Sequence, residues 1–96
     1  MNTRDEVLNF LRQHKEEFAE RFSVRRIGLF GSFLRGESRD ESDVDILVAM
    51  DQPTFDHYMD LKFFLEEHLH RSVDLVLEET VKPRLKPILA REVAYA

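Results

Sequence analysis

The sequence contains no cysteine and no tryptophan, and it has only three glycines and three prolines among 96 residues. Without cysteine the chain can form neither a disulfide nor a zinc site built on thiolates, which is compatible with a reducing cytoplasm. It also lacks the run of about 20 apolar residues that a membrane span requires. Residues 1–6 (MNTRDE) are charged, unlike an apolar export signal. We therefore expect a cytoplasmic protein that does not associate with membranes.

Basic residues are outnumbered, because the chain has 14 Lys and Arg against 19 Asp and Glu, a formal net charge of -5 at pH 7. This balance argues against the broad cationic surface used for sequence-independent nucleic-acid binding, so we expect no direct nucleic-acid binding. A chain of 96 residues lies near the lower limit for a core without disulfides or metals. Because we find no repeat or linker, we expect one domain over residues 1–96, with room for a site but not for a large substrate pocket.

The stretch from residue 31 to residue 48 (GSFLRGESRDESDVDILV) places a glycine turn and an acidic pair between two apolar runs. The first run predicts a strand over residues 24–30 that passes into a short helical turn over residues 32–35. Residues 37–42 are polar and predict an exposed loop. The second run, residues 44–48, is rich in β-branched residues and predicts a second strand.

The acidic pair consists of Asp43 and Asp45. Because side chains at positions i and i+2 of a strand share a face, the two carboxylates project together while Val44 points away. Such close like charges repel each other, and their paired oxygens suit a hard cation such as Mg²⁺. Gly31 lets the backbone approach a ligand closely, and the amides and the Ser32 hydroxyl that follow favour an anionic phosphate. For both features to meet one ligand, the two strands must be neighbours and antiparallel.

The N-terminal region predicts a helix. Thr3 and Glu6 form a capping box, and the helix that it opens reaches about Phe22. Its apolar stripe consists of Val7, Leu8, Leu11, His14 and Phe18. We expect this stripe to cover one face of the sheet, with His14 packed or half-exposed rather than acting as a ligand.

Thr54 can cap a second helix, which reaches about Leu69 and is followed by a strand over residues 72–77. A strand, helix, strand unit of this length favours a parallel crossover, so Asp74 is expected beside the acidic pair. Residues 80–83 fit the entry of a last helix. The apolar positions of the two helices are Phe55, Tyr58, Leu61, Leu65 and Leu69, then Leu85, Ile88, Leu89 and Val93. The predicted fold class is α/β, a small mixed β-sheet flanked by helices.

Gly31-Ser32, ten further residues and Asp43-Val44-Asp45 resemble the GS and DxD signature of the nucleotidyltransferase superfamily that includes DNA polymerase beta. The chain is similar in particular to the minimal nucleotidyltransferase (MNT) domains, which occur as antitoxins beside HEPN toxins. The features that carry this closer resemblance are Arg35-Gly36, Ser42 and the short length of the chain. Asp74, a third carboxylate in an apolar strand, also fits. The resemblance therefore extends over most of the chain.

The resemblance implies a polymerase beta-like nucleotidyltransferase fold and a reaction that uses ATP and two Mg²⁺ ions. The implied catalytic and metal-binding residues are Asp43, Asp45 and Asp74. The implied nucleotide-binding residues are Gly31, Ser32 and Arg35. Asp74 is the implied metal ligand and general base. Phe33 departs from the pattern, because such domains often carry a basic or small residue there.

The leading functional hypothesis is transfer of AMP from ATP to a hydroxyl group of a partner HEPN ribonuclease toxin. The resemblance implies a tyrosine as the acceptor and silencing of the toxin. A homo- or hetero-oligomer is compatible with the sequence, which does not determine the oligomeric state. One alternative is a non-catalytic antitoxin that neutralises its toxin by binding. Another is a small-molecule or RNA nucleotidyltransferase, although those usually carry an added substrate domain. The intact set of site residues favours catalysis, because binding alone would not require it.

Simpler explanations exist for single residues. Ser32 can be an ordinary helix N-cap, Arg35 can be exposed without a role, and the acidic pair can belong to a solvated loop. The glycine spacing over residues 31–36 is similar to a P-loop, but Glu37 stands where that motif needs lysine.

Two further groups of residues carry weaker signals. His68 and His70 have the spacing of a zinc pair without an evident third ligand, so we expect them at the surface. Lys82, Arg84 and Lys86 form a basic group near the start of the last helix, where the helix dipole disfavours cations. This group indicates an anion or an acidic partner nearby, or else a solvated face.

Overall fold

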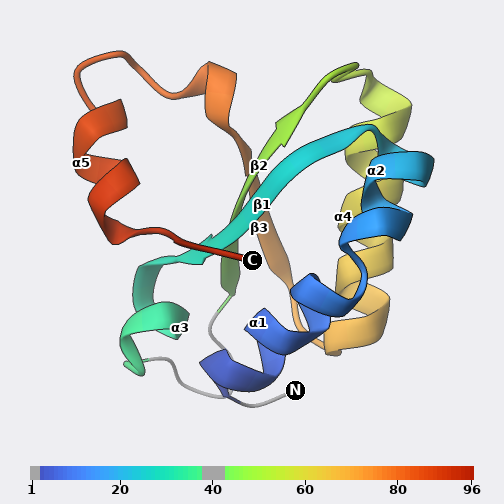
Figure 1. Cartoon of the computed structure of the whole chain (residues 1–96). Helices are drawn as coiled ribbons and strands as arrows, with labels where there is room; N and C mark the ends of the chain where they lie inside the picture. The colour runs from blue at the N-terminus through green and yellow to red at the C-terminus, as the bar shows by residue number, and fades with distance from the viewer. Residues whose placement is uncertain (1–2, 38–42) are drawn as a thin grey trace.

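A mixed four-stranded β-sheet lies at the centre of the fold, in the strand order β3-β2-β1-β4 (Figure 1). The computed structural model describes residues 3–37 and 43–96. The strands are β1 (Val24–Phe30), β2 (Val44–Met50), β3 (Val73–Leu77) and β4 (Ala94–Tyr95). β1 is antiparallel to β2 and to β4, whereas β2 and β3 are parallel. The predicted α/β class and both predicted strand pairings are confirmed, and β4 is an addition to them.

Helices cover the two faces of the sheet unequally, with α1, α2 and α4 on one side and α5 on the other (Figure 1). The helices are α1 (Arg4–Gln13), α2 (Lys15–Phe22), α3 (Gly31–Arg35), α4 (Phe55–Leu69) and α5 (Lys86–Glu92), with a 3-10 helix η1 (Glu78–Thr80) after β3. The crossover through α4 allows β2 and β3 to run parallel. Within the described ranges, no helix is both long enough and apolar enough to cross a bilayer.

The hydrophobic core fills the space between the sheet and the three helices α1, α2 and α4. Because strand residues alternate between faces, Ile27 and Leu29 of β1 point into this core with their partners Val48 and Ile46 of β2. The fully buried residues that α1, α2 and α4 contribute are Val7, Leu11, Phe18, Leu61, Leu65 and Leu69. One face of the sheet therefore holds most of the apolar surface that stabilises the fold.

The two predicted Thr caps are present, whereas the last helix begins at Lys86, after the predicted entry at residues 80–83. The Glu6 N–H donates to the Thr3 hydroxyl at 3.2 Å, and the His57 N–H donates to the Thr54 hydroxyl at 3.1 Å. The prediction of one N-terminal helix is wrong, because the chain leaves helical geometry at His14 (φ -105, ψ 10) and forms α1 and α2.

The break at His14 coincides with a shared acceptor. The Phe10 carbonyl accepts the His14 N–H at 3.2 Å, and the His14 imidazole Nδ1 lies 2.9 Å from the same oxygen. The ring is half-buried against aromatic neighbours, with centroid distances of 4.3 Å to Phe10, 6.0 Å to Phe18 and 5.9 Å to Phe64. The expectation that His14 is a packed residue is therefore confirmed.

Some positions predicted to be apolar contacts lie in solvent. Phe55 is 75% exposed because the fully buried stripe of α4 begins only at Leu61. On α5, Leu85 and Ile88 are 45% and 53% exposed, and none of the helix residues is buried. The prediction that the apolar side of the last helix packs in the core is therefore wrong. Cavities lie between α5 and the sheet.

The outer edge of β3 is occupied by side chains. The Val73 N–H donates to Glu66 Oε2 at 2.9 Å. The Tyr58 hydroxyl donates to the Leu75 carbonyl at 2.6 Å, and the Thr80 hydroxyl donates to the Leu77 carbonyl at 2.8 Å. Two of these side chains come from α4, which therefore both covers the sheet and borders it.

Candidate active site

Gly31 forms the sharp turn between β1 and α3. Its φ of +76° is a conformation that other residues rarely adopt. A Cβ built on this glycine would overlap the Oδ2 atom of Asp45 and lie 2.9 Å from its Cγ. The Asp45 carboxylate thus packs directly on the bare backbone of Gly31, and both the turn and this contact require glycine.

The short helix α3 follows this turn, as the sequence predicts. Gly36 closes it with φ +74°, and the Glu37 N–H donates to the Ser32 carbonyl at 2.9 Å. Ser32 is partly exposed beside the turn. Phe33 points the other way and is 1% exposed, with the Arg71 guanidinium 5.1 Å from its ring centroid. Phe33 is therefore a core residue.

The parallel register places Asp74 of β3 directly opposite Asp45 of β2. Paired residues on adjacent strands share a face and lie about 5 Å apart, so the two carboxylates stand side by side. Asp45 is half-buried and Asp74 is exposed. Asp43 precedes β2 and is exposed. The structure thus brings together the two carboxylates that the sequence places far apart.

The electrostatics of Asp45 reflect this crowding. Burial raises the pKa of its carboxyl group first, and the charges of Asp74 and Asp43 raise it further. The positive charge of Arg35 acts in the opposite direction, which places this side chain within electrostatic reach. The Arg35 guanidinium itself is exposed and bonds to Glu37, with Nε 3.1 Å from Oε2. A phosphate that bound Arg35 through Nε would have to replace Glu37.

This donor set suits a divalent cation. Carboxylate oxygens that repel one another are stabilised by a hard ion between them, and Mg²⁺ prefers oxygen ligands. Among residues 3–37 and 43–96, no group of three or more His, Asp or Glu side chains forms a ready-made metal cage. Mg²⁺ usually binds through one or two carboxylates together with substrate phosphates and water, so a complete protein cage is not needed.

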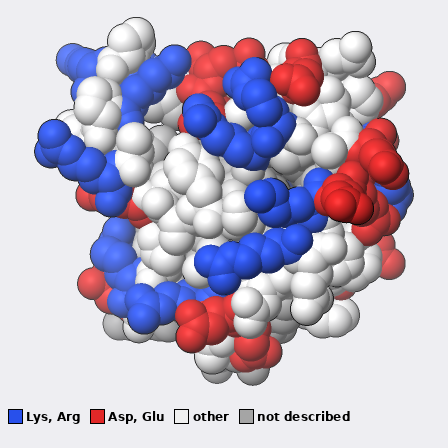
Figure 2. Space-filling view, viewed as in Figure 1, with Lys and Arg blue, Asp and Glu red and all other residues white. Residues whose placement is uncertain are grey.

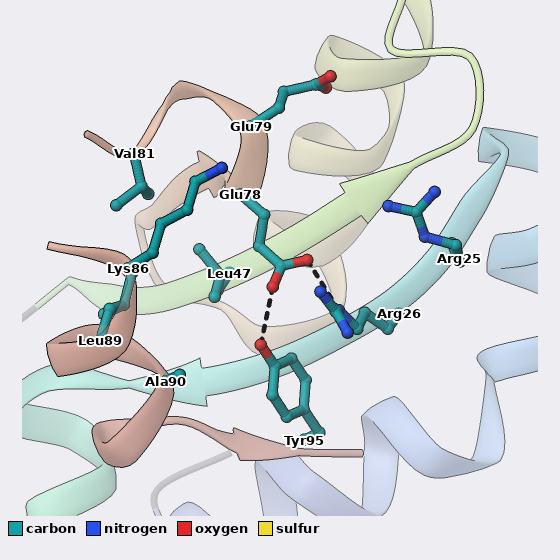
Figure 3. Close-up of a pocket in the computed structure, with 10 residues that line it drawn as sticks. All are labelled: Arg25, Arg26, Leu47, Glu78, Glu79, Val81, Lys86, Leu89, Ala90 and Tyr95. Atoms are coloured by element: carbon teal, nitrogen blue, oxygen red, sulfur yellow. Dashed lines mark hydrogen bonds and ion pairs between the residues drawn. The ribbon is translucent and has the colours of Figure 1, made fainter. Parts of the chain in front are cut away.

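A second polar cluster on the same face of the sheet was not predicted. Figure 3 shows the Glu78 carboxylate between Arg26 and Tyr95, at 2.8 Å from Arg26 Nε and 2.8 Å from the Tyr95 hydroxyl. Burial favours the protonated form of Glu78, but the bonds from Arg26 and Tyr95 outweigh it and lower its pKa. These residues line a cavity of about 410 Å³ beneath α5. The cluster ties β4 to the end of β3.

The two histidines near the end of α4 lie at the surface, as expected. His68 stacks on Phe64 with ring centroids 4.1 Å apart, and its Nδ1 lies 2.8 Å from the Phe64 carbonyl. His70 ends α4 in the left-handed conformation with φ 55. Both have structural explanations in the local packing and the helix end.

Comparison with known proteins assigns the family. The nucleotidyltransferase domain family matches residues 11–95. The protein adenylyltransferase MntA of Thermococcus cleftensis is 43% identical over 96 residues, which is 99% of this chain and 97% of that protein. A solved structure described as a minimal nucleotidyltransferase aligns with a TM-score of 0.74 at 37% identity, over 91% of this chain and 93% of that chain.

A more distant structure shares the fold. It is a chain from the complex of a tri-AMPylated Shewanella oneidensis HEPN toxin with an MNT antitoxin. It aligns with a TM-score of 0.62 at 20% identity, over 92% of this chain and 70% of that chain. The family match over residues 11–95 and the relative of 43% identity establish that the chain belongs to the nucleotidyltransferase domain family and is a nucleotidyltransferase.

Proposed function

We propose that this nucleotidyltransferase transfers AMP from ATP to a tyrosine hydroxyl of a HEPN-family toxin and acts as the antitoxin of that toxin. The observation that carries the proposal is the Asp45 carboxylate, held against Gly31 and paired with Asp74. It occurs in a chain that is 43% identical, over nearly its whole length, to a protein named as a protein adenylyltransferase. The HEPN toxin complex that shares the fold supports the choice of partner.

The reaction is a single displacement at phosphorus. The acceptor oxygen attacks the α-phosphorus of ATP, a new oxygen–phosphorus bond forms, and the bond from the α-phosphorus to the bridging oxygen breaks. Pyrophosphate leaves with that electron pair. The proton of the hydroxyl passes to a carboxylate, and Asp74 is suited to this role because it is exposed beside Asp45.

The other site residues hold the donor. Gly31 leaves space at the turn, Ser32 offers a hydroxyl donor, and Arg35 offers positive charge to the triphosphate. Two Mg²⁺ ions bound by Asp43, Asp45 and Asp74 would neutralise the phosphate charge that develops during transfer.

Intact-mass spectrometry tests this function. The protein is mixed with a HEPN-family protein, ATP and Mg²⁺, and we expect the HEPN protein to gain the mass of one or more AMP groups. Asp74→Asn removes the proposed base, so the gain should disappear. Asp56→Asn, which changes an exposed aspartate on α4, is the matched control and should leave the gain intact.

Two outcomes would contradict the proposal. An unmodified HEPN protein alongside efficient labelling of an aminoglycoside or a nucleoside would indicate a small-molecule enzyme. Full neutralisation of the toxin by Asp74→Asn, without any mass gain, would indicate a non-catalytic antitoxin that acts by binding.

A further inference from the structure

An apolar groove opens on the face of the sheet that carries the carboxylates. It has a volume of about 490 Å³ and lies between the sheet and α5. Phe30 of β1 and Val76 of β3 line its sheet side, and Leu85, Ile88 and Leu89 line its helix side. We name this surface the α5 groove, and these five residues form its apolar lining.

The α5 groove begins where the carboxylates stand. Phe30 is the direct partner of Asp45 in the β1–β2 register. Val76 follows Asp74 by two positions on β3, so both side chains point to the same face of the sheet. Two residues along a strand span about 7 Å. A polypeptide segment that lies in the groove can therefore present a side chain to Asp45 and Asp74.

The helix side of the groove is incompletely covered in this chain. Leu85 is 45% exposed and Ile88 is 53% exposed, although both are large aliphatic residues next to one another on the surface. Exposed apolar surface beside a functional site is typical of a contact surface for another protein. A purine base is the competing occupant, because the lining also includes the polar side chains of Thr80, Arg84 and Glu92. The affinity for ATP distinguishes a base from a protein segment.

The charge around the groove indicates the chemistry of the segment. Lys82 and Arg84 line the groove together with a single acidic residue, Glu92. Figure 2 shows Lys and Arg gathered around uncharged surface over α5 and the segment before it, at the left of the view. This local excess of positive charge contrasts with the formal net charge of -5 for the whole chain. Complementarity therefore favours an acidic partner.

From these observations we infer that the α5 groove is the docking site for the acceptor protein: it binds an apolar segment flanked by acidic residues and presents the acceptor hydroxyl to Asp45 and Asp74. The inference rests on the proposed function for the identity of the acceptor. It adds the surface that selects the acceptor, which lies outside the nucleotide-binding residues.

Kinetics with the HEPN-family protein as acceptor test the docking site. Ile88→Ser should lower kcat/KM for AMP transfer roughly tenfold, mainly through a higher KM, because a central apolar contact is lost. The affinity for ATP with Mg²⁺ should not change. Phe63→Ser, which removes a 57% exposed aromatic side chain from α4, is the matched control and should retain wild-type kinetics.

A charge variant adds an independent readout. Arg84→Glu should slow association with the HEPN protein and weaken the salt dependence of the rate, because the charge that attracts the acidic partner is reversed. The side chains of Phe63, Arg84 and Ile88 are all exposed, so the three variants should have the melting temperature of the wild type. Thermal unfolding followed by circular dichroism verifies this.

Other results of these measurements would overturn the docking site or separate it from the proposed function. Wild-type kinetics for both Ile88→Ser and Arg84→Glu would overturn the docking site, and a loss of ATP affinity in Ile88→Ser would assign the groove to the base of the nucleotide. Hydrogen exchange of the protein mixed with the HEPN protein, without ATP, separates docking from catalysis. Protection of α5 without any AMP transfer would retain the docking site and reject the proposed function, whereas neither protection nor transfer would reject both.

Discussion

The two faces of the sheet are made by the same strands but serve different purposes. The face under α1, α2 and α4 is closed by fully buried aliphatic and aromatic side chains. The face under α5 carries Asp45, Asp74 and the Glu78 cluster, together with two cavities. Because alternate residues of β2 point to opposite faces, this one strand supplies residues to the core and to the candidate site. The comparison indicates that stability and chemistry can be changed separately by choosing the face.

The largest effect on stability should come from the covered face. Leu65→Ala removes a fully buried side chain of α4 and should lower the free energy of unfolding by about 2–5 kcal/mol. Denaturant unfolding measures the loss, and the folded fraction should still bind ATP with Mg²⁺. Phe55→Ala, at a position that is 75% exposed, serves as the control and should change stability little. Equal losses in the two variants would contradict the assignment of the core.

Gly31→Ala should lower both the stability of the fold and the rate of AMP transfer. Alanine at positive φ costs about 1–2 kcal/mol, and the new Cβ would also displace the Asp45 carboxylate. Misplacement of a reacting group by about 1 Å can lower a rate roughly 100-fold, so AMP transfer should fall by a similar factor.

Gly36→Ala is the matched control for this variant. It has a similar φ of +74°, but no atom lies within 4 Å of its built Cβ. It should show only the conformational cost in thermal unfolding and should retain transfer. If both alanine variants lose transfer equally, the contact between Gly31 and Asp45 has no role in the site.

Glu78→Gln should have a moderate effect that depends on pH. The charged form of Glu78 is stabilised in the folded protein, because its pKa lies below its ordinary value of 4.5. Its contribution is therefore present above pH 4.5 and is lost as pH falls through the lowered pKa. At pH 7 the variant should lose about 1 kcal/mol, and the loss should shrink in acid. Glu79→Gln, its exposed neighbour, is the control, and a loss independent of pH would contradict the ionic explanation.

Asp45→Asn should produce the smallest change in stability, and it should be an increase, unlike the losses expected for the other variants. The pKa of Asp45 is raised above its ordinary value of 3.8, so the native state holds its proton to a higher pH than the unfolded chain. Wild-type stability therefore falls as pH rises from 3.8 through the raised pKa, and the variant avoids this loss. In metal-free buffer at pH 7 the variant should melt slightly above the wild type, and Mg²⁺ should stabilise only the wild type. A lower melting temperature would mark Asp45 as a structural residue.

Local patterns in the sequence predict the parts of the fold that local chemistry determines. The bounds of β1, the Gly36 helix end and the Thr54 cap follow from turn and capping preferences of neighbouring residues. The pairing of Asp45 with Asp74 follows from the length of one crossover. The functional roles assigned to the six site residues stay predictions; these residues are Gly31, Ser32, Arg35, Asp43, Asp45 and Asp74.

Other features depend on contacts between distant segments, which periodicity does not reveal. The bonds of Glu78 join residues from β1 and β4, so they form only once the sheet is assembled. β4 has two residues, which pair with Gly28 and Leu29 of β1, and so short a strand leaves no pattern to recognise. The apolar residues of α5 suggest a core face, but Ile88 is 53% exposed. Periodicity shows that a helix has an apolar side and does not show whether that side packs in the core.

The occupied edge of β3 determines how another chain can approach Asp74. A free strand edge attracts further strands, which leads to aggregation or to strand addition by a binding peptide. Here Glu66, Tyr58 and Thr80 already bond to three of the outward backbone groups of β3, those of Val73 N–H, Leu75 O and Leu77 O. A peptide therefore cannot extend the sheet beside Asp74 without breaking these bonds. These three bonds disfavour strand addition at this edge, and they favour the approach of another chain over the face of the sheet.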